Sequence, residues 1–327
     1  MSASFFKSST FKKYLCRVIA NSFAFFSFFS FSLYFLSLYV GGDQLHYSQF
    51  YEGSSGLSYF DAYLYARDTI GASDPLSIFF LWLGSWLGIP KSIYVSIWNS
   101  LFLLILLNIF RKHSVSWFLY PFLFSNFYIL VLLTGAERLK FGFIFLALSI
   151  CFSSRFFWFS LLISFLSHFQ MLLLAPSMAI RRAWPFFLRA LKTGRVAKKI
   201  FPLAFISVLL LVVLFYCFRD ALLGKFLAYY RYEIDFSYAI NVFVLFLCSI
   251  FVSKDWKRMF VSFLPFFVLV LLLGDSRINI LAVFFVFWVF ISERRLAHPV
   301  SLSLILYFTV KSFGFIYNVY HFGNGFA

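Results

Sequence analysis

The sequence has few charged residues for its length. Asp, Glu, Lys and Arg make up 12% of its 327 residues, whereas a soluble globular domain carries roughly 25%. Apolar runs long enough to cross a bilayer recur along the chain, which leaves no stretch for a large soluble domain. The alternating pattern of a membrane β-barrel is also missing, and a continuous apolar run such as 201–218 requires helix in lipid. The sequence therefore predicts a helical membrane protein.

Cysteine and acidic residues are also scarce. The four cysteines form no CxxC pair, so we expect neither a metal site nor a disulfide framework. They are Cys16, Cys151, Cys217 and Cys248. The 12 acidic residues stand against 28 basic ones, a net charge of +16. Because cytoplasmic loops of membrane proteins collect Lys and Arg, we explain this charge by topology and expect no nucleic-acid partner. No repeat or linker is visible, so we expect one integral membrane domain over residues 1–327.

The basic residues set the expected topology. The first apolar run, 14–40, starts beside four basic residues at 7, 12, 13 and 17. It is too long for a cleaved signal peptide and lacks a small-x-small cleavage site. We therefore expect a retained membrane anchor with its N-terminus in the cytoplasm. A basic loop at about 181–199 is expected on the same side. Three shorter basic clusters are placed there as well, at 111–112, 254–258 and 294–295.

The expected fold is an all-α, polytopic transmembrane bundle of roughly 9–12 helices, including broken or re-entrant segments. A GT-C-like arrangement is one option. The segment 76–89 is short and ends at a proline, so a re-entrant or broken helix is expected there. The segment 156–180 fits either one tilted span or two half-helices that meet near His168. The other expected spans are 14–40, 92–110, 115–133, 139–154, 201–218, 238–252, 260–273, 278–291 and 300–318.

The charges on the predicted outer face carry the functional signal. The polar loop at about 41–75 is expected outside, as are nearly all acidic residues; only Asp255 and Glu293 fall inside. Several basic residues also fall outside, against the positive-inside bias, so topology does not explain them. They are Arg67, Arg138, Lys140, Arg219, Lys225, Arg231 and Arg277. Arg219 and Arg231 share one loop, which is either a solvated amphipathic segment or a grip on substrate.

Arg138 and Arg277 each begin a helix at a glycine-containing corner near the outer interface. Ionisable groups near membrane depth usually face a cavity or a partner, and a guanidinium matches phosphate geometry. A helix N-terminus adds a favourable dipole and backbone donors. We therefore expect an anion site for a lipid-linked phosphate, with Lys140 as a further candidate. The alternative is that Glu137 and Asp275 pair with these arginines only to anchor the corners.

Two other groups of residues are candidates with an open interpretation. His168 lies inside an apolar run, where it is either an interhelical hydrogen-bond partner or a proton carrier. Asp43 begins the outer loop, with Tyr47 and Tyr51 following at four-residue spacing. Interfacial aromatics are commonly belt residues, but rings beside carboxylates also form sugar-binding surfaces.

The order of these features resembles a known family. It comprises Gly41-Gly42-Asp43 and Tyr47 after the first helix, Asp74-Pro75 before a short helix, Arg138-Leu-Lys-Phe-Gly142 opening a helix, and His168 about thirty residues later. This pattern resembles the EpsG-like branch of the Wzy-type bacterial polysaccharide polymerases (O-antigen or capsule) and covers most of the chain. Gly142 stands where the family often has Ala, and Lys140 is an added charge. The last third matches only in layout, so Arg277 rests on the charge argument alone.

The resemblance implies an enzyme of the bacterial inner membrane that joins undecaprenyl-diphosphate-linked oligosaccharide repeat units at the outer face. A sugar hydroxyl of one unit attacks the anomeric carbon of another, and undecaprenyl diphosphate leaves. The expected roles are diphosphate binding by Arg138, Arg277 and Lys140, base catalysis by His168, Glu137 or Asp43, and sugar contact by Tyr47 and Tyr51. A preformed lipid donor needs no nucleotide, so no cofactor and no metal is expected. Besides the bilayer, a chain-length regulator is a partner to consider.

Two other functions remain open. One is another outer-face transferase, either an O-antigen ligase or a glycosyltransferase that uses a polyprenyl-phosphate sugar. The sequence features above fit these enzymes nearly as well as a polymerase. A flippase or other transporter of lipid-linked oligosaccharides would need a path open to both faces and often shows pseudo-repeats. The unusual charges here gather at the predicted outer face and no repeat is visible, which favours a transferase.

Overall fold

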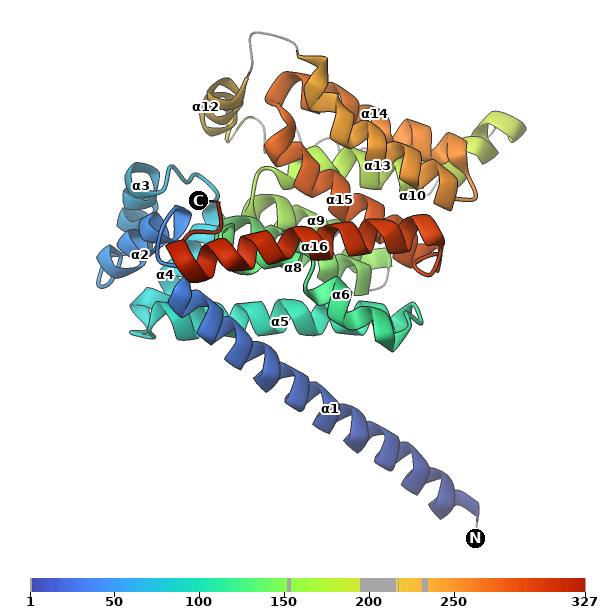
Figure 1. The fold of residues 1–327 in the computed structure, drawn as a ribbon, viewed down its shortest axis with the longest axis horizontal. Helices are drawn as coiled ribbons and strands as arrows, with labels where there is room; N and C mark the ends of the chain where they lie inside the picture. The colour runs from blue at the N-terminus through green and yellow to red at the C-terminus, as the bar shows by residue number, and fades with distance from the viewer. Residues whose placement is uncertain (1, 152–153, 195–215, 217, 231–234, 327) are drawn as a thin grey trace. The chain divides into compact units, whose positions relative to one another are not determined.

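The structure is a computed structural model and describes residues 2–151, 154–194, 216, 218–230 and 235–326. All regular structure in these residues is helical, which confirms the predicted all-α fold class (Figure 1). The helices of residues 2–151 are α1 (Ser2–Leu38), α2 (Asp43–Gly53), α3 (Tyr59–Thr69), α4 (Pro75–Trp86), α5 (Lys91–Lys112), η1 (Trp117–Leu119), α6 (Tyr120–Phe124), α7 (Phe127–Thr134) and α8 (Glu137–Cys151). Those that follow are α9 (Ser154–Ser167), α10 (Met171–Thr193), α12 (Arg219–Tyr229), η2 (Phe236–Tyr238), α13 (Ala239–Val252), α14 (Trp256–Leu273), α15 (Asp275–Ser292) and α16 (Pro299–Phe322).

Four helical segments in the described residues are long and apolar enough to cross a membrane, namely Tyr14–Leu38, Lys91–Lys112, Trp256–Leu273 and Pro299–Phe322. A fifth results if the pair Trp117–Phe124 and Phe127–Thr134, bent by 54°, is one broken span. Asn126 accounts for the break, since its side chain accepts from the backbone N–H of Tyr128 and caps α7. The protein is therefore a multi-pass membrane protein. The predicted span 201–218 lies almost wholly outside the described residues.

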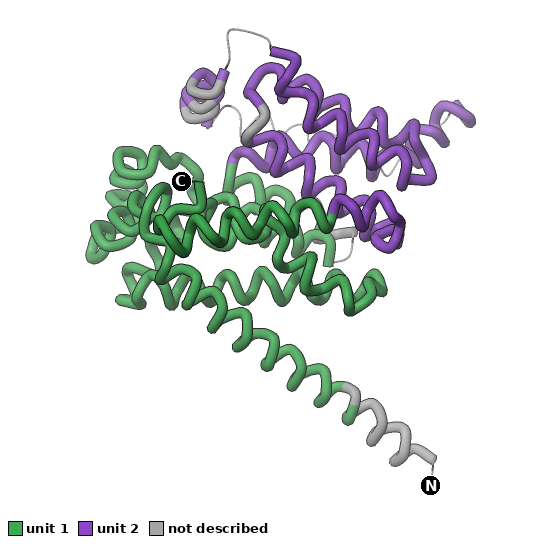
Figure 2. Tube along the Cα trace, in the orientation of Figure 1, with its two compact units in different colours: residues 1–168, 305–327 green, residues 169–304 purple. Residues whose placement is uncertain are grey.

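The chain groups into two compact units, which are described separately (Figure 2). Unit 1 contains residues 1–168 and 305–327, and unit 2 contains residues 169–304. The segment 156–180 follows the second of its two predicted forms, because α9 ends at Ser167 and α10 begins at Met171. His168 is the first residue after α9, and its backbone N–H still donates to the Ser164 carbonyl at 3.0 Å.

In unit 1, α1 and α5 run antiparallel and are joined by polar contacts along their length. The Ser32 hydroxyl donates to Ser96 at 3.0 Å, and the Asn99 amide donates to Ser32 at 2.7 Å. Further along, Arg17 of α1 donates to Asn108 of α5 at 3.5 Å. Such contacts replace the hydrophobic effect as the link between helices in lipid.

The two ends of unit 1 differ in character. At one end, which we call the loop end, residues 43–69 form helices α2 and α3. The backbone N–H groups of Val40 and Gly41 donate to the Gly323 carbonyl there at 3.0 and 2.8 Å, so residues 323–326 lie at the loop end too. Gly42 has φ +57°, a left-handed conformation that allows the sharp turn from α1 into α2. The opposite end, which we call the basic end, contains Arg17 and the last turn of α5.

In unit 2, α10 and α13 each pack against α14 and α15, and polar contacts link α10 to its neighbours. Arg181 donates to Glu293 at 2.7 Å, and Arg258 donates from Nε to the Arg181 carbonyl at 2.8 Å. Trp184 donates to Asp255 at 3.2 Å. The basic segment 181–199 was expected to be a loop, but it continues α10 as helix to Thr193, and its remainder from 195 lies outside the described residues. The buried Arg181 ion pair holds the start of this segment against α15.

Candidate active site

The side chain of Asp74 is the centre of a buried polar cluster at the loop end. Its Oδ2 atom lies 3.1 Å from Nδ1 of His168 and accepts from the Arg138 guanidinium at 3.4 Å. The Asp74 side chain is fully buried, and those of His168 and Arg138 are 7% and 16% exposed. One carboxylate oxygen therefore holds an imidazole and a guanidinium at the same point.

Local sequence explains why these three side chains meet. Pro75 at the first position of α4 favours extended backbone at Asp74, which has φ −87° and ψ 106°. Asp74 occupies the N-cap position of α4, but its side chain makes no capping bond and reaches into the cluster instead. Arg138 lies in the first turn of α8, just after the corner that ends α7. His168 follows the last residue of α9, which the Ser164 hydroxyl fastens to the Gly142 carbonyl of α8 at 2.7 Å.

Arg138 also contacts Tyr47 of α2. Its Nε atom donates to the Tyr47 hydroxyl at 3.4 Å. Burial raises the pKa of Tyr47, the Arg138 guanidinium lowers it, and the carboxylates of Glu137 and Asp43 raise it. The net direction is upward, so this hydroxyl stays neutral. The contacts of Arg138 with the Tyr47 hydroxyl and with Asp74 are both 3.4 Å long, beyond the usual 2.7–3.2 Å.

Glu137, next to Arg138, holds a second group of polar side chains. Its carboxylate is fully buried; Oε1 accepts from the Gln44 amide at 2.7 Å and lies 3.5 Å from the Lys91 ammonium. Lys91 also donates to Gln44 Oε1 at 2.6 Å and to Ser48 at 3.0 Å. The Gln44 amide further donates to the Thr134 carbonyl. Oε2 of Glu137 has no hydrogen-bond partner among the described residues. Glu137 thus ties the starts of α2, α5 and α8 together.

The side chain of Tyr47 lies between the two partly exposed cations of the site. The Lys91 ammonium is 5.8 Å from the centre of the Tyr47 ring, and Arg138 contacts the hydroxyl of the same residue. The Lys91 and Arg138 side chains are 14% and 16% exposed. Each cation has a buried carboxylate next to it, so the cluster is close to neutral without a ligand. An incoming anion would have to share these cations with Glu137 and Asp74.

The side chain of Lys140 has a different environment from the one predicted. It is fully buried, and its ammonium donates to Asn99 of α5 at 2.6 Å. Asn99 in turn donates to Ser32 at 2.7 Å and to the Leu133 carbonyl at 2.8 Å. Lys140 therefore links α8 to α1, α5 and α7 through one amide. Because its ammonium is directed into the helix packing, the geometry does not support the diphosphate-binding role predicted for Lys140.

Asp43 and the two tyrosines predicted to contact sugar differ in how exposed they are. Asp43 is exposed at the start of α2. Tyr51 is 4% exposed, donates to the Ile89 carbonyl at 2.8 Å and packs on the ring of Tyr94 at 6.2 Å. Tyr47 is 6% exposed between Lys91 and Arg138. Neither tyrosine offers an open ring face in this structure, so the geometry does not support the predicted stacking of a sugar on them.

Three predicted residues belong to the other part of the chain. Arg277 is exposed in the first turn of α15, and Arg219 is exposed at the start of α12, where it pairs with Asp220 at 3.2 Å. Arg231 lies outside the described residues. Because Arg277 is in unit 2 and Arg138 in unit 1, their joint action on a diphosphate stays a prediction.

Sequence reasoning missed Lys91, Gln44 and Asn99, and it named Asp74 only as part of a motif. The signals were present but ambiguous. Asp74 precedes a proline and Lys91 follows one, which marks both as helix starts rather than as charge partners. Asn99 lies with Ser96 and Ser100 in an otherwise apolar run, a pattern that indicates helix packing.

Neither a metal-binding group nor a comparison with other proteins identifies the function of this site. Among the described residues, no group of three or more His, Cys, Asp or Glu side chains is placed to hold a metal ion. The chain matches no protein-family model, and no curated protein or solved structure matches it. The site geometry therefore carries the functional argument.

Proposed function

We propose that the protein is a membrane glycosyltransferase that polymerises undecaprenyl-diphosphate-linked oligosaccharide repeat units. The observation that carries this proposal is the buried contact of Asp74 with both His168 and Arg138. It combines an oriented base with a cation suited to phosphate, the two functions that transfer from a lipid diphosphate requires. The resemblance to the Wzy-type polymerases supports the same reaction.

In the proposed reaction, His168 is the base. A carboxylate at Nδ1 favours the neutral tautomer with the proton on Nδ1 and the lone pair on Nε2, and it stabilises the ring once that ring is protonated. Nε2 accepts the proton of the acceptor hydroxyl while the hydroxyl oxygen bonds to the anomeric carbon. The bond from that carbon to the diphosphate oxygen breaks, and its electron pair leaves with undecaprenyl diphosphate. Asp74 acts on His168 and is a positioning residue.

Arg138 and Lys91 are the proposed ligands of the diphosphate. A guanidinium binds two phosphate oxygens with a fixed fork, whereas an ammonium acts as a point charge. Both side chains are partly exposed at the loop end, and both contact Tyr47. Glu137 holds Lys91 and the three helix starts, so we assign it a structural role rather than that of the base.

The proposed location is the bacterial inner membrane, with the loop end at its outer face and the N-terminus in the cytoplasm. The charges support this orientation. The loop end has five acidic residues in segment 41–75 and only one arginine, whereas the start of α1 and the end of α5 are basic. The positive-inside rule places basic ends in the cytoplasm.

The test is reconstitution of the purified full-length protein with undecaprenyl-diphosphate-linked repeat units. A ladder of longer glycans on a gel is the expected result, and it should disappear with His168→Ala but persist with His46→Ala. His46 is an exposed histidine of α2, so it is a matched control. Transfer of a glycan only to a lipid A acceptor would indicate a ligase. Movement of intact lipid across the bilayer without ladder formation would contradict a transferase.

A further inference from the structure

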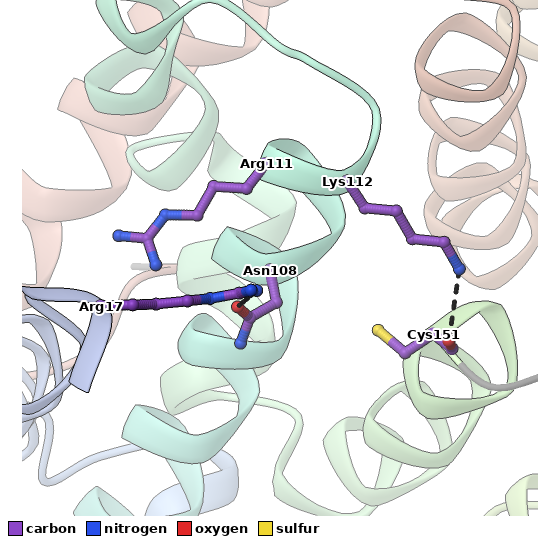
Figure 3. Close-up of a pocket in the computed structure, with 5 residues that line it drawn as sticks. All are labelled: Arg17, Asn108, Arg111, Lys112 and Cys151. Carbon is purple, nitrogen blue, oxygen red and sulfur yellow. Dashed lines mark hydrogen bonds between the residues drawn. The ribbon is translucent and has the colours of Figure 1, made fainter. Parts of the chain in front are cut away.

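A second group of cations lines a cavity at the basic end of unit 1, apart from the site described above. The cavity has a volume of about 510 Å³ and is lined by Arg17 of α1, by Asn108, Arg111 and Lys112 of α5, and by Cys151 of α8. Figure 3 shows the side chain of Arg17 reaching toward Asn108 and that of Lys112 reaching to the end of α8. Two helices of one unit, α1 and α5, thus bring three cations to a cavity that the end of α8 also lines.

The hydrogen bonds of these cations orient them without neutralising them. Arg17 donates to the side-chain oxygen of Asn108 at 3.5 Å, and Arg111 donates to that of Asn21. Lys112 donates to two backbone carbonyls at the end of α8, at 3.0 and 3.2 Å. Every one of these acceptors is an uncharged oxygen. The pair of reciprocal arginine–asparagine bonds fixes α1 against α5, and none of the lining residues that the structure describes carries a compensating negative charge.

Among the described residues no carboxylate lines the cavity, and the acidic residues of unit 1 all lie elsewhere in that unit. All acidic residues of unit 1 belong to the loop end: Asp43, Glu52, Asp61, Asp68, Asp74 and Glu137. The positive-inside bias explains why cations lie at the basic end, but it does not require that they converge on a cavity. Uncompensated charge close to a low-dielectric region is costly, so a negative ligand would stabilise this arrangement.

The surroundings favour a lipid as the source of that negative charge. The cavity lies between helices of which two, α1 and α5, contain membrane-spanning segments, and it is at the end of those segments. Trp117 and Phe118, which follow the last turn of α5, are 79% and 50% exposed. Exposed aromatics of this kind typically lie at the level of lipid headgroups. Basic pockets between transmembrane helices on the cytoplasmic side are known to bind anionic headgroups.

We propose that this cavity binds the phosphate group of an anionic phospholipid, with Arg17 and Arg111 as its principal ligands. Guanidinium forks fit phosphate oxygens, and Lys112 adds a point charge. A bound headgroup would link α1 to α5 and α8 at the basic end. Free phosphate has the same binding chemistry and differs only in lacking acyl chains. The proposal does not depend on the glycosyltransferase reaction at the loop end.

The test counts lipids bound to the full-length protein in detergent by native mass spectrometry. Phosphatidylglycerol, phosphatidylcholine and inorganic phosphate are added separately. We expect one phosphatidylglycerol to bind in preference to phosphatidylcholine. R17Q/R111Q should weaken this binding about 30-fold, and R17K/R111K should retain most of it, because each surface cation contributes about fivefold. R189Q/K192Q removes the same charge from exposed positions of α10 and should bind phosphatidylglycerol like wild type.

A labelling measurement locates the bound lipid. Cys151 lines the cavity, so with the other three cysteines replaced by serine, phosphatidylglycerol should slow its reaction with a maleimide. Should R17Q/R111Q fail to fold, R17Q alone tests the same point, because the Arg17 contact to Asn108 is long and exposed. Equal binding by wild type and R17Q would overturn the proposal. Full displacement of the lipid by inorganic phosphate would overturn the lipid assignment.

Discussion

Nδ1 of His168 lies 3.1 Å from Oδ2 of Asp74, a residue 94 positions earlier in the chain. The contact joins the break after α9 to the loop before α4. Both positions lie where helices stop or start, so their backbone is not committed to helical hydrogen bonds on both sides. A broken helix is a common way to bring a polar site close to a membrane, because irregular backbone is tolerated only where it is buried in protein or lines a cavity.

Asp74→Asn tests whether His168 needs its carboxylate partner for catalysis, whereas His168→Ala removes the imidazole itself. The amide keeps the shape of the side chain but cannot stabilise a protonated imidazole. Because positioned bases contribute about 10²–10⁴-fold, we expect His168→Ala to reduce polymerisation by that factor and Asp74→Asn by at least tenfold. Initial rates of ladder formation check this, with membrane insertion as control. Normal rates in both variants would rule out the pair as catalytic machinery.

Arg138→Lys and Arg138→Ala test whether the guanidinium fork is needed. Lys keeps the charge but binds phosphate at one point, so a moderate loss of about tenfold is expected. Ala removes the charge near the leaving group, and a loss of about 10²–10³-fold is expected, as for other donors to developing anions. Arg67→Ala is the matched control, since Arg67 is an exposed arginine of the neighbouring helix α3. Chain lengths and rates equal to wild type in Arg138→Ala would refute diphosphate binding by Arg138.

The buried contact of Lys140 with Asn99 predicts strong coupling in stability. Asn99→Leu leaves an ammonium without its acceptor, and Lys140→Met leaves an amide oxygen unpaired. Lys140→Met should cost about 1.5–3 kcal/mol, as for other hydrogen bonds to charged groups. Asn99→Leu should cost more, because it also removes the bonds to Ser32 and to the Leu133 carbonyl, and the double variant should cost less than the sum of the two. Thermal unfolding in detergent of the wild type, the two single variants and the double variant measures these stability changes. Additive effects would show that the two side chains act independently.

The direction of the Lys140 side chain could not be predicted from the sequence. Arg138 and Lys140 are two residues apart in α8, and a helix turns about 200° over that distance. If Arg138 is directed to the loop-end site, Lys140 must be directed away from it, into the packing with α5. Charge sorting by membrane side treats both residues alike, because it uses only the distance along the chain. The all-α membrane fold, by contrast, follows from composition and apolar run length, and it is confirmed.

The partners of Arg138 and His168 were beyond sequence reasoning for a related reason. Both residues were named from their position, but Asp74 unites them across 64 and 94 residues of chain. An Asp before Pro at a helix start is normally interpreted as a cap for its own helix. Only the tertiary arrangement reveals that the side chain turns away from α4. Likewise, Lys91 and Glu137 look like isolated helix-start residues until Gln44 joins them.

The backbone contact between Val40 and Gly323 predicts on which side of the membrane the last residues lie. The Val40 N–H donates to the Gly323 carbonyl at 3.0 Å, so residues 323–326 must be on the same side as segment 41–75. With the native cysteines replaced by serine, Asn324→Cys and Ser55→Cys should both react with an impermeant maleimide added from outside. Ser114→Cys, in the turn after α5 at the basic end, should react only after the membrane is opened. Because the contact is between backbone atoms of one compact unit, labelling of positions 324 and 55 from opposite sides would contradict the fold itself. Labelling of both from the cytoplasm would leave the fold intact but reverse the proposed orientation, and the loop-end cluster would then act on a cytoplasmic substrate.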